Sequence, residues 1–341
     1  MSQHLLIVGD PGGVPRLLRA QQGPSLAMTS LCLTADIPRL AGLRFVDRIL
    51  ATGPQEESND AWVATAVSAH RAFSVTQAAV FDPNVYTRAA AVADVLGIEL
   101  YPRLEFAAIN DHWAMRQRLR AADHLDVQVA RAPDRASLER YVAEHGLPCL
   151  LRSRLADRPA ALLRSLDDVD RAARGGAGVV VSPGEHMVVE SATTAPLFRI
   201  AVLVEDGRSE ALAVLRHHRR SLRDAHGSEA GAGPVRVAEE DGTTLARLRA
   251  QAAYLAQVLG VRDGLVLVEL AVDNARVHIG GVRLGPPGEQ TQRAVLQATG
   301  VDLTLCCARQ ACGLPTLARA VETANTFGSA AGSWPDRPRW T

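Results

Sequence analysis

The chain has 341 residues, of which 47% are hydrophobic and 22% charged, and its formal net charge is zero. This composition is typical of a globular protein with enough apolar residues for two or three packed units. The balanced charge argues against nucleic acid or an anionic membrane as a partner, and no apolar run approaches the roughly 20 residues of a membrane span.

The sequence contains no lysine, because all 37 residues of its Lys+Arg count are arginine. Chemistry that needs a side-chain amine is therefore excluded, including a phosphate-binding P-loop lysine and a Schiff base. The richness in Ala, Arg, Gly and Val is typical of a GC-rich coding bias, which by itself replaces Lys with Arg.

Five cysteines, an odd number, do not indicate a disulfide framework, and a reduced cytoplasm is the simplest setting for them. They are Cys32, Cys149, Cys306, Cys307 and Cys312. We expect the last three to pack within a helix rather than to bind a metal ion. The N-terminus has no basic segment before its first apolar run, so a signal peptide is not predicted and we expect a cytoplasmic protein.

The first hundred residues alternate short apolar runs with amphipathic stretches. The predicted strands are Leu5–Val8, Leu31–Leu33, Ile49–Leu50 and Ala79–Phe81, and the predicted helices are Val14–Gln22, Asp60–Ala72 and Val85–Leu96. This alternation predicts a doubly wound parallel sheet. The glycines of Gly9–Gly13 do not complete a G-x-G-x-x-G motif, so we favour a plain βα turn over a phosphate cradle.

A small α+β unit is predicted next, followed by an antiparallel sheet. The unit has helices at Trp113–Ala122, Arg135–His145 and Leu166–Arg174, an extended segment at Leu125–Ala130, a strand at Pro148–Leu151, and glycines at 175–178. The sheet has strands at Met187–Glu190, Phe198–Glu205, Glu210–Leu215, Leu265–Val272 and Arg276–Val282, with a helix at Thr243–Leu259 and two closing helices. Asp206-Gly207 is a hairpin-turn signal. Residues 216–233 are predicted to be a loop.

Segments in chain order resemble motifs of the ATP-grasp superfamily. They are Asn110–Arg116 (its Asp-Lys helix start), Gly146–Arg152 (its Gly-Tyr-Pro-Val-Val-Val-Lys strand), Val188–Ser191 with Ala195–Ile200 (its hinge), Leu259–Leu270 (its metal-carboxylate strand) and Ala298–Leu303 (its Ala-Thr-Gly-Val-Asp-Leu helix end). The chain is most similar to carboxylate–amine ligases of secondary metabolism. The resemblance implies an α/β and α+β fold of four parts: an N-terminal pre-ATP-grasp domain (1–106), a lid (107–185), a C-terminal subdomain (186–328) and a tail (329–341).

The resemblance also implies ATP and Mg²⁺ as cofactors and an acyl-phosphate intermediate. His112 and Arg152 stand where the family has its two lysines, Glu190 lies in the nucleotide hinge, Glu269 is the metal carboxylate, and Arg283 is the catalytic arginine. Other positions depart from the family: the flap 153–159 has no glycine, Leu197 replaces a carboxylate, and Ile279 and Gly281 replace the bridging Glu and the Asn. Because Mg²⁺ prefers several anionic oxygen ligands, we expect ATP and Mg²⁺ to bind weakly.

Two histidine features have both a functional and a structural interpretation. The loop residues His217, His218, Arg219, Arg220, Arg223 and His226 could grip a carboxylate or phosphate, with His217 or His218 as acid/base catalyst, or could form a solvated basic loop. His278 is expected beside Glu269 across a hairpin, either as a Glu/His pair in the metal site or as a partly exposed strand histidine.

Three hypotheses for function follow. The leading one is a degenerate ATP-grasp protein, a pseudoenzyme without ordinary ATP turnover, which binds a small carboxylate or phosphate in specialised metabolism as a binding or partner protein or as an ATP-independent enzyme. The alternative is a true ATP-dependent carboxylate–amine ligase that uses Arg152 and His112 in place of lysines. The third is a structural subunit of a hetero-oligomer, and a homo-oligomer is equally open. If the motif register is right, Arg152, Glu190, Glu269 and Arg283 converge between the lid and the antiparallel sheet.

Overall fold

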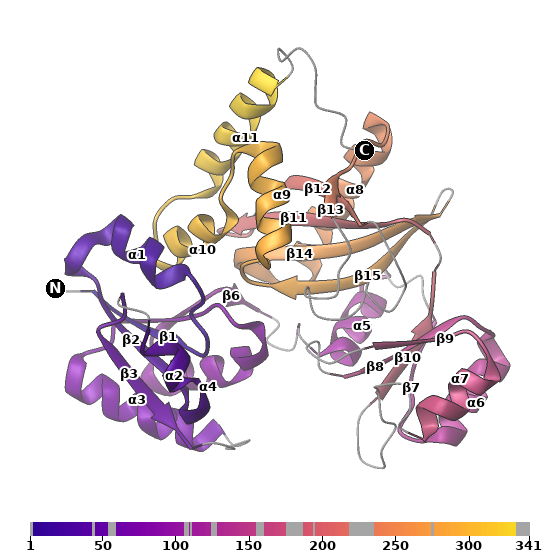
Figure 1. Cartoon of the computed structure of the whole chain (residues 1–341), viewed down its shortest axis with the longest axis horizontal. Helices are drawn as coiled ribbons and strands as arrows, with labels where there is room; N and C mark the ends of the chain where they lie inside the picture. Colours follow the sequence, from indigo (N-terminus) through magenta and orange to yellow (C-terminus); the bar gives the residue numbers. More distant parts are fainter. Residues whose placement is uncertain are drawn as a thin grey trace.

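The computed structural model describes residues 3–42, 45–53, 59–105, 109, 111–123, 128–154, 160–174, 187–193, 195–217, 235–273 and 276–331. Several predicted features lie outside these residues: Asn110, His218 with the rest of the basic loop, the flap segment 155–159, the glycines 175–178, and the tail from 332. Figure 1 shows three sheets, with the N-terminal sheet and the lid on either side below a larger C-terminal sheet.

The first sheet is parallel, in the order β3-β2-β1-β4-β5. Its strands are β1 (His4–Val8), β2 (Ala27–Leu33), β3 (Arg48–Thr52), β4 (Gln77–Val80) and β5 (Glu99–Tyr101), and its helices are α1 (Val14–Gln22), α2 (Ile37–Leu40), α3 (Asn59–Phe73) and α4 (Tyr86–Leu96). The predicted doubly wound arrangement is therefore confirmed. Strand β5 and helix α2 were not predicted, since both are too short to show a period.

The side chains of β1 alternate between the two faces of this sheet, and they are buried on both. Leu6 and Val8 belong to a core formed with α3 and α4. Leu5 and Ile7 belong to a core that contains residues of α1 and also of α10 (Leu303–Ala311), near the other end of the chain. The same core continues into the C-terminal sheet through Leu203 and Leu265. The N-terminal and C-terminal sheets are thus joined by one continuous apolar core.

The second sheet, the lid sheet, is antiparallel, in the order β7-β10-β8-β9. Its elements are β7 (Val129–Arg131), α6 (Arg135–His145), β8 (Cys149–Ser153), β9 (Ala160–Leu163), α7 (Leu166–Ala173) and β10 (Met187–Ser191). Strand β9 was not predicted. Cys149 and Leu151 pack against α6 and α7. Because side chains alternate along a strand, Leu150 and Arg152 lie on the opposite face of the sheet.

The third sheet runs β13-β12-β11-β14-β15, and β6 pairs with β14. Its strands are β6 (Arg103–Leu104), β11 (Leu197–Glu205), β12 (Arg208–His217), β13 (Val235–Val237), β14 (Val261–Asp273) and β15 (Arg276–Leu284), and the helices around it are α5 (His112–Ala121), α8 (Gly242–Val258), α9 (Glu289–Thr299), α10 and α11 (Leu317–Ala331). The predicted turn is confirmed, since Asp206 and Gly207 have φ of 49° and 74°. Up to residue 331, where the described part of the chain ends, three closing helices rather than the two expected follow β15.

Two elements pack with a different part of the molecule from the one that the predicted domain limits assign them to. The limits themselves remain predictions. Strand β10 follows residue 186 but pairs with lid strands. Helix α5 lies within 107–185, yet its Met115 and Leu119 pack in the apolar core of the C-terminal sheet with residues of α8. None of the described helices combines the length and the apolar character needed to cross a bilayer.

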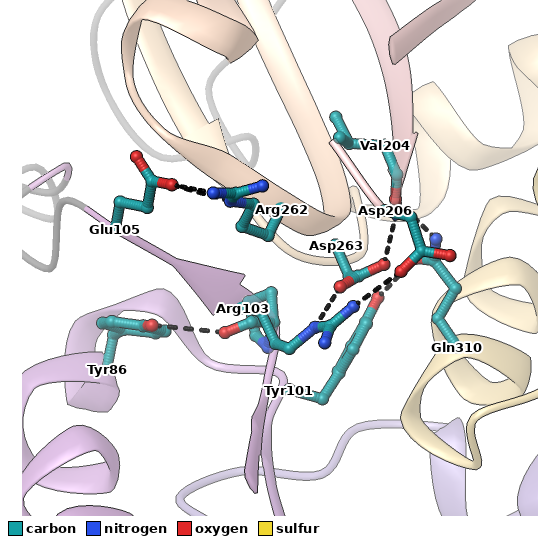
Figure 2. Close-up of polar contacts among 10 residues, drawn as sticks. Tyr86, Tyr101, Arg103, Glu105, Val204, Asp206, Arg262, Asp263 and Gln310 are labelled. Atoms are coloured by element: carbon teal, nitrogen blue, oxygen red, sulfur yellow. Dashed lines mark hydrogen bonds and ion pairs between the residues drawn. The ribbon is translucent and has the colours of Figure 1, made fainter. Parts of the chain in front are cut away.

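Polar contacts hold the N-terminal sheet against the start of β14 (Figure 2). Arg103 forms ion pairs with Asp263 and, at 2.9 Å, with Asp206. The Tyr101 hydroxyl donates to Oε1 of Gln310 on α10 at 3.2 Å. Gly264 completes the junction, because a Cβ at this residue would lie 2.7 Å from Cβ of Pro102. With φ of 144°, Gly264 also has a backbone conformation that other residues rarely adopt.

We predict that Gly264→Ala destabilises the protein by more than the backbone strain alone. Gly97 is the matched control, because it has φ of 62° at the end of α4 and open space where a Cβ would stand. Gly97→Ala should cost about 1–2 kcal/mol of unfolding free energy. Gly264→Ala should cost about 1–3 kcal/mol more, through the clash with Pro102. Urea unfolding of the two variants measures the difference, and equal losses would contradict the close approach at the junction.

We predict a loss of stability above pH 9 from the cysteines, all five of which are buried and free. Burial raises the pKa of Cys32 and Cys312 from 9.0 to about 11, and that of Cys149, Cys306 and Cys307 to about 12. The folded state keeps these thiols neutral, so their stabilising effect is complete below pH 9 and is lost as pH rises to about 12. Each thiol contributes a slope of up to about 1.4 kcal/mol per pH unit.

Denaturant unfolding at pH 8, 9, 10 and 11 tests this slope. A Cys306→Ala variant, with one thiol fewer, should show a shallower decline than the wild type. A free energy of unfolding that stays level to pH 11 would mean that the thiols ionise as readily in the folded state.

Candidate functional site

The candidate site lies between the lid sheet and the C-terminal sheet. Its first element is the ion pair between Arg152 on β8 and Glu190 on β10. In the antiparallel register Arg152 lies opposite Val188 and Glu190 opposite Leu150, so the two charged residues are diagonal neighbours on the sheet face turned away from α6 and α7. Both are buried, with 4% and 3% of their surface exposed, so water screens their charges little.

Helix α5 brings a second guanidinium to the same carboxylate. Nε and Nη2 of Arg116 both lie 2.9 Å from Oε2 of Glu190, and Arg116 is only 1% exposed. The start of this helix is fixed by Asp111, whose side chain caps it by accepting from the Ala114 N–H and also pairs with Arg154 at the end of β8. One buried carboxylate therefore holds two arginines from different subdomains.

A β-bulge supplies an acceptor for both arginines. In the β14–β15 register Glu269 lies opposite Gly281 and Leu270 opposite Ile279, which leaves Gly280 as the extra residue. The Gly280 carbonyl oxygen accepts from Nη2 of Arg116 at 3.2 Å and contacts the Arg152 guanidinium at 3.5 Å. A Cβ at Gly280 would lie 3.3 Å from Cβ and from O of Glu269, so the bulge leaves little room for a side chain.

Histidine and carboxylate neighbours complete the surroundings of Arg152. Nδ1 of His112 lies 3.4 Å from Nη1 of Arg152, which places these two predicted residues together. Burial lowers the pKa of Arg152, Glu190 raises it, the positive charge of Arg116 lowers it, and Glu269 raises it. Glu269 is thus close enough to act electrostatically on Arg152. Three of the four residues expected to converge, Arg152, Glu190 and Glu269, do so.

Glu269 itself forms a buried ion pair. Its Oε1 accepts from Nη2 of Arg199 on β11 at 2.7 Å, and Nη1 of Arg199 donates to the Thr291 hydroxyl on α9 at 2.9 Å. The residues present do not fit a Mg²⁺ ion, because an arginine already binds this carboxylate and Gly281 across the strand has no side chain. Ile279 packs in the apolar core with Leu270. Among the described residues, no group of three His, Cys, Asp or Glu side chains could hold a metal ion.

The remaining predicted residues lie on strands β12 and β15 of the C-terminal sheet, except for one that lies outside the described residues. Arg283 is half-buried on β15 opposite Leu267. Since Gly281 lies opposite Glu269, the register places Arg283 on the same sheet face as Glu269, and no hydrogen bond or ion pair between them is seen in the described part of the chain. His217 ends β12, where its backbone pairs with Val235, and His218 falls outside the described residues. His278 lies on β15 opposite Ala271, two residues along β14 from Glu269, and it is partly exposed, as the structural interpretation expects.

Two arginines of the cluster were not predicted. Arg116 lies four residues after His112, which puts both on one side of α5, and this spacing is the signal that sequence reasoning could have used. Arg199 gives a weaker signal, as a single charged residue inside the otherwise apolar strand Leu197–Val204. A charge at such a position requires a buried partner.

A cavity of about 250 Å³ elsewhere, at the junction shown in Figure 2, is a weaker candidate. Three of the carboxylates that line it, Glu205, Asp206 and Asp263, already have structural partners. Glu205 accepts from the N–H groups of Thr316 and Leu317 at 2.7 and 3.1 Å, and Asp263 holds Arg103. We therefore assign these groups to the packing of the two sheets and not to ligand chemistry.

No protein-family model matches the sequence, and no curated protein matches it either. Solved structures do. An L-amino acid ligase from Bacillus licheniformis superposes with a TM-score of 0.71 at 16% identity, covering 91% of this chain and 74% of that one. The ADP complex of an N5-carboxyaminoimidazole ribonucleotide synthetase gives 0.71 at 15% identity, covering 92% and 78%. Biotin carboxylase from Campylobacter jejuni gives 0.64 at 15% identity, covering 91% and 71%. The chain therefore has the ATP-grasp fold.

Proposed function

We propose that the chain binds a small organic carboxylate or phosphate between its lid sheet and its C-terminal sheet, without ordinary ATP turnover. The observation that carries this proposal is the pairing of charges in the site. Arg116 and Arg152 share the single carboxylate of Glu190, and Glu269 is paired with Arg199. The three arginines therefore exceed the two carboxylates by one positive charge. Arginine here holds the carboxylates that a metal ion would need, and guanidinium groups bind carboxylate and phosphate well.

The biological role that fits this chemistry is that of a binding or partner protein, or of an ATP-independent enzyme, in a specialised biosynthetic pathway. The neighbours by fold include ligases, which supports descent from a carboxylate-activating ancestor. A further possible role is that of a structural subunit in a hetero-oligomer with a catalytically active relative. Co-purification with such a relative, together with loss of its activity when this chain is removed, would favour that role.

The second candidate is a true ATP-dependent carboxylate–amine ligase. One observation favours it: His112 and Arg152, which stand at the two lysine positions by resemblance, lie 3.4 Å apart. In that case both would contact the nucleotide phosphates in place of lysines. Against it, Arg152 is already bound to Glu190, so a phosphate must compete with a buried carboxylate.

We predict that Mg·ATP binds with a dissociation constant no tighter than about 1 mM, which corresponds to about −4 kcal/mol. The physical reason is that both carboxylates of the site are engaged by arginines, so neither is available to a metal ion. Isothermal calorimetry with ATP, in Mg²⁺ and separately in EDTA, measures the constant. Micromolar binding of ATP that disappears in EDTA would contradict the proposal and favour the ATP-dependent ligase.

We predict that small organic anions raise the melting temperature, and more so at pH 6 than at pH 8. An unperturbed histidine loses its charge through roughly pH 6 to 7, so the contribution of His217 and His218 to anion binding falls over that range. A thermal-shift screen of phosphate and small dicarboxylates at both pH values measures this, with a His217→Ala, His218→Ala double variant for comparison. A shift that is unchanged in the variant would assign binding to the arginines, and no shift in either protein would contradict anion binding.

A further inference from the structure

The two oxygens of one carboxylate are divided between two arginines. Oε1 of Glu190 pairs with Arg152, and Oε2 with Arg116. Glu190 belongs to the lid strand β10, while Arg116 belongs to α5, which packs on the C-terminal sheet. The carboxylate therefore occupies the position that an external anion would need in order to contact both guanidinium groups.

The arginines have capacity beyond Glu190. Nη1 of Arg116 is buried and makes no hydrogen bond within the described residues, although the side chain is 99% covered. The Gly280 carbonyl is the second acceptor that both arginines share. A buried N–H donor without an acceptor costs free energy. A ligand with several oxygens would supply an acceptor to Nη1 of Arg116, which Glu190 does not reach.

We propose that Glu190 is an internal competitor for the ligand: a compact oxyanion, inorganic phosphate or the carboxylate or phosphoryl group of a small molecule, binds Arg116 and Arg152 by displacing it. This inference rests on the proposed function, since it requires anion binding at this interface. One anion is exchanged for another, so the cluster keeps its charge balance and no metal ion takes part. Displacement breaks the direct ion pair between β10 and α5, and the ligand, bound to Arg152 of the lid sheet and Arg116 of α5, replaces Glu190 as the link between them.

Competition of this kind lowers the apparent affinity of the ligand. The ligand binds only the fraction of molecules in which the arginines are released, and its dissociation constant is raised by the inverse of that fraction. Replacing Glu190 with a neutral residue of the same shape should remove the competitor. A glutamate that instead contacts the ligand through its charge would give the opposite result.

The test is calorimetric titration of the full chain with inorganic phosphate. In Glu190→Gln the affinity should rise by about ten-fold or more over the wild type, equally in Mg²⁺ and in EDTA. Glu240→Gln is the matched control, because Glu240 also pairs with an arginine, Arg216 at 2.8 Å, but outside the cluster. Its phosphate affinity should equal that of the wild type.

Glu190→Asp provides a second variant if Glu190→Gln does not fold. It keeps the charge but withdraws the carboxylate by one methylene, so the affinity should rise by a smaller factor. Phosphate affinity that is unchanged or reduced in the folded Glu190 variant would overturn the competitor role and leave anion binding itself intact. No binding of phosphate or of any small carboxylate by wild type and variant alike would instead overturn the proposed function.

Discussion

The site depends on one buried interaction, the pairing of Glu190 with Arg116 and Arg152. Three charges with exposures of 1–4% come together from a lid helix–sheet unit and from a helix packed on the C-terminal sheet. Taking such groups out of water is costly, and removing one partner of a buried pair typically costs about 3–5 kcal/mol. The relative position of the lid and the sheet is therefore linked to the ion pairs of a single carboxylate.

The absence of lysine has a structural counterpart in this cluster. Arg116 uses Nε and Nη2 on Glu190 while Nη2 also reaches the Gly280 carbonyl. A planar guanidinium permits several directed bonds at once, whereas an ammonium group is a compact and strongly hydrated charge. A GC-rich coding bias, which the composition indicates, favours arginine over lysine throughout the chain. At these positions the arginines form a network of internal bonds. A lysine there would keep its charge more readily available to a phosphate.

Most helices and strands could be predicted from the periodicity of apolar residues. The elements and contacts that could not be predicted depend on how separate segments pair. The helices α1 and α6 were predicted with their observed limits, because each has a clear period and a defined boundary residue. Strand β9, Ala160–Leu163, gave no signal of its own, since a short apolar run is ambiguous without its partner β8. Arg152, Glu190 and Glu269 could be found from motif order. Their engagement by Arg116 and Arg199 could not, because it depends on how separate elements meet, and the bulge at Gly280 is likewise a property of strand pairing.

The packing of α10 against the first sheet has a consequence for how this chain folds. Leu5 and Ile7 share a core with Leu303 and Cys307, which follow them only after almost all of the intervening elements. Domains generally fold as units while the chain is made, N-terminal parts first. Here α1 covers only part of one face of the N-terminal sheet, and the rest is covered once α10 has been synthesised. We therefore expect the half-made chain to carry exposed apolar surface beside α1, and the N-terminal sheet to reach its full stability only when α10 has packed against it.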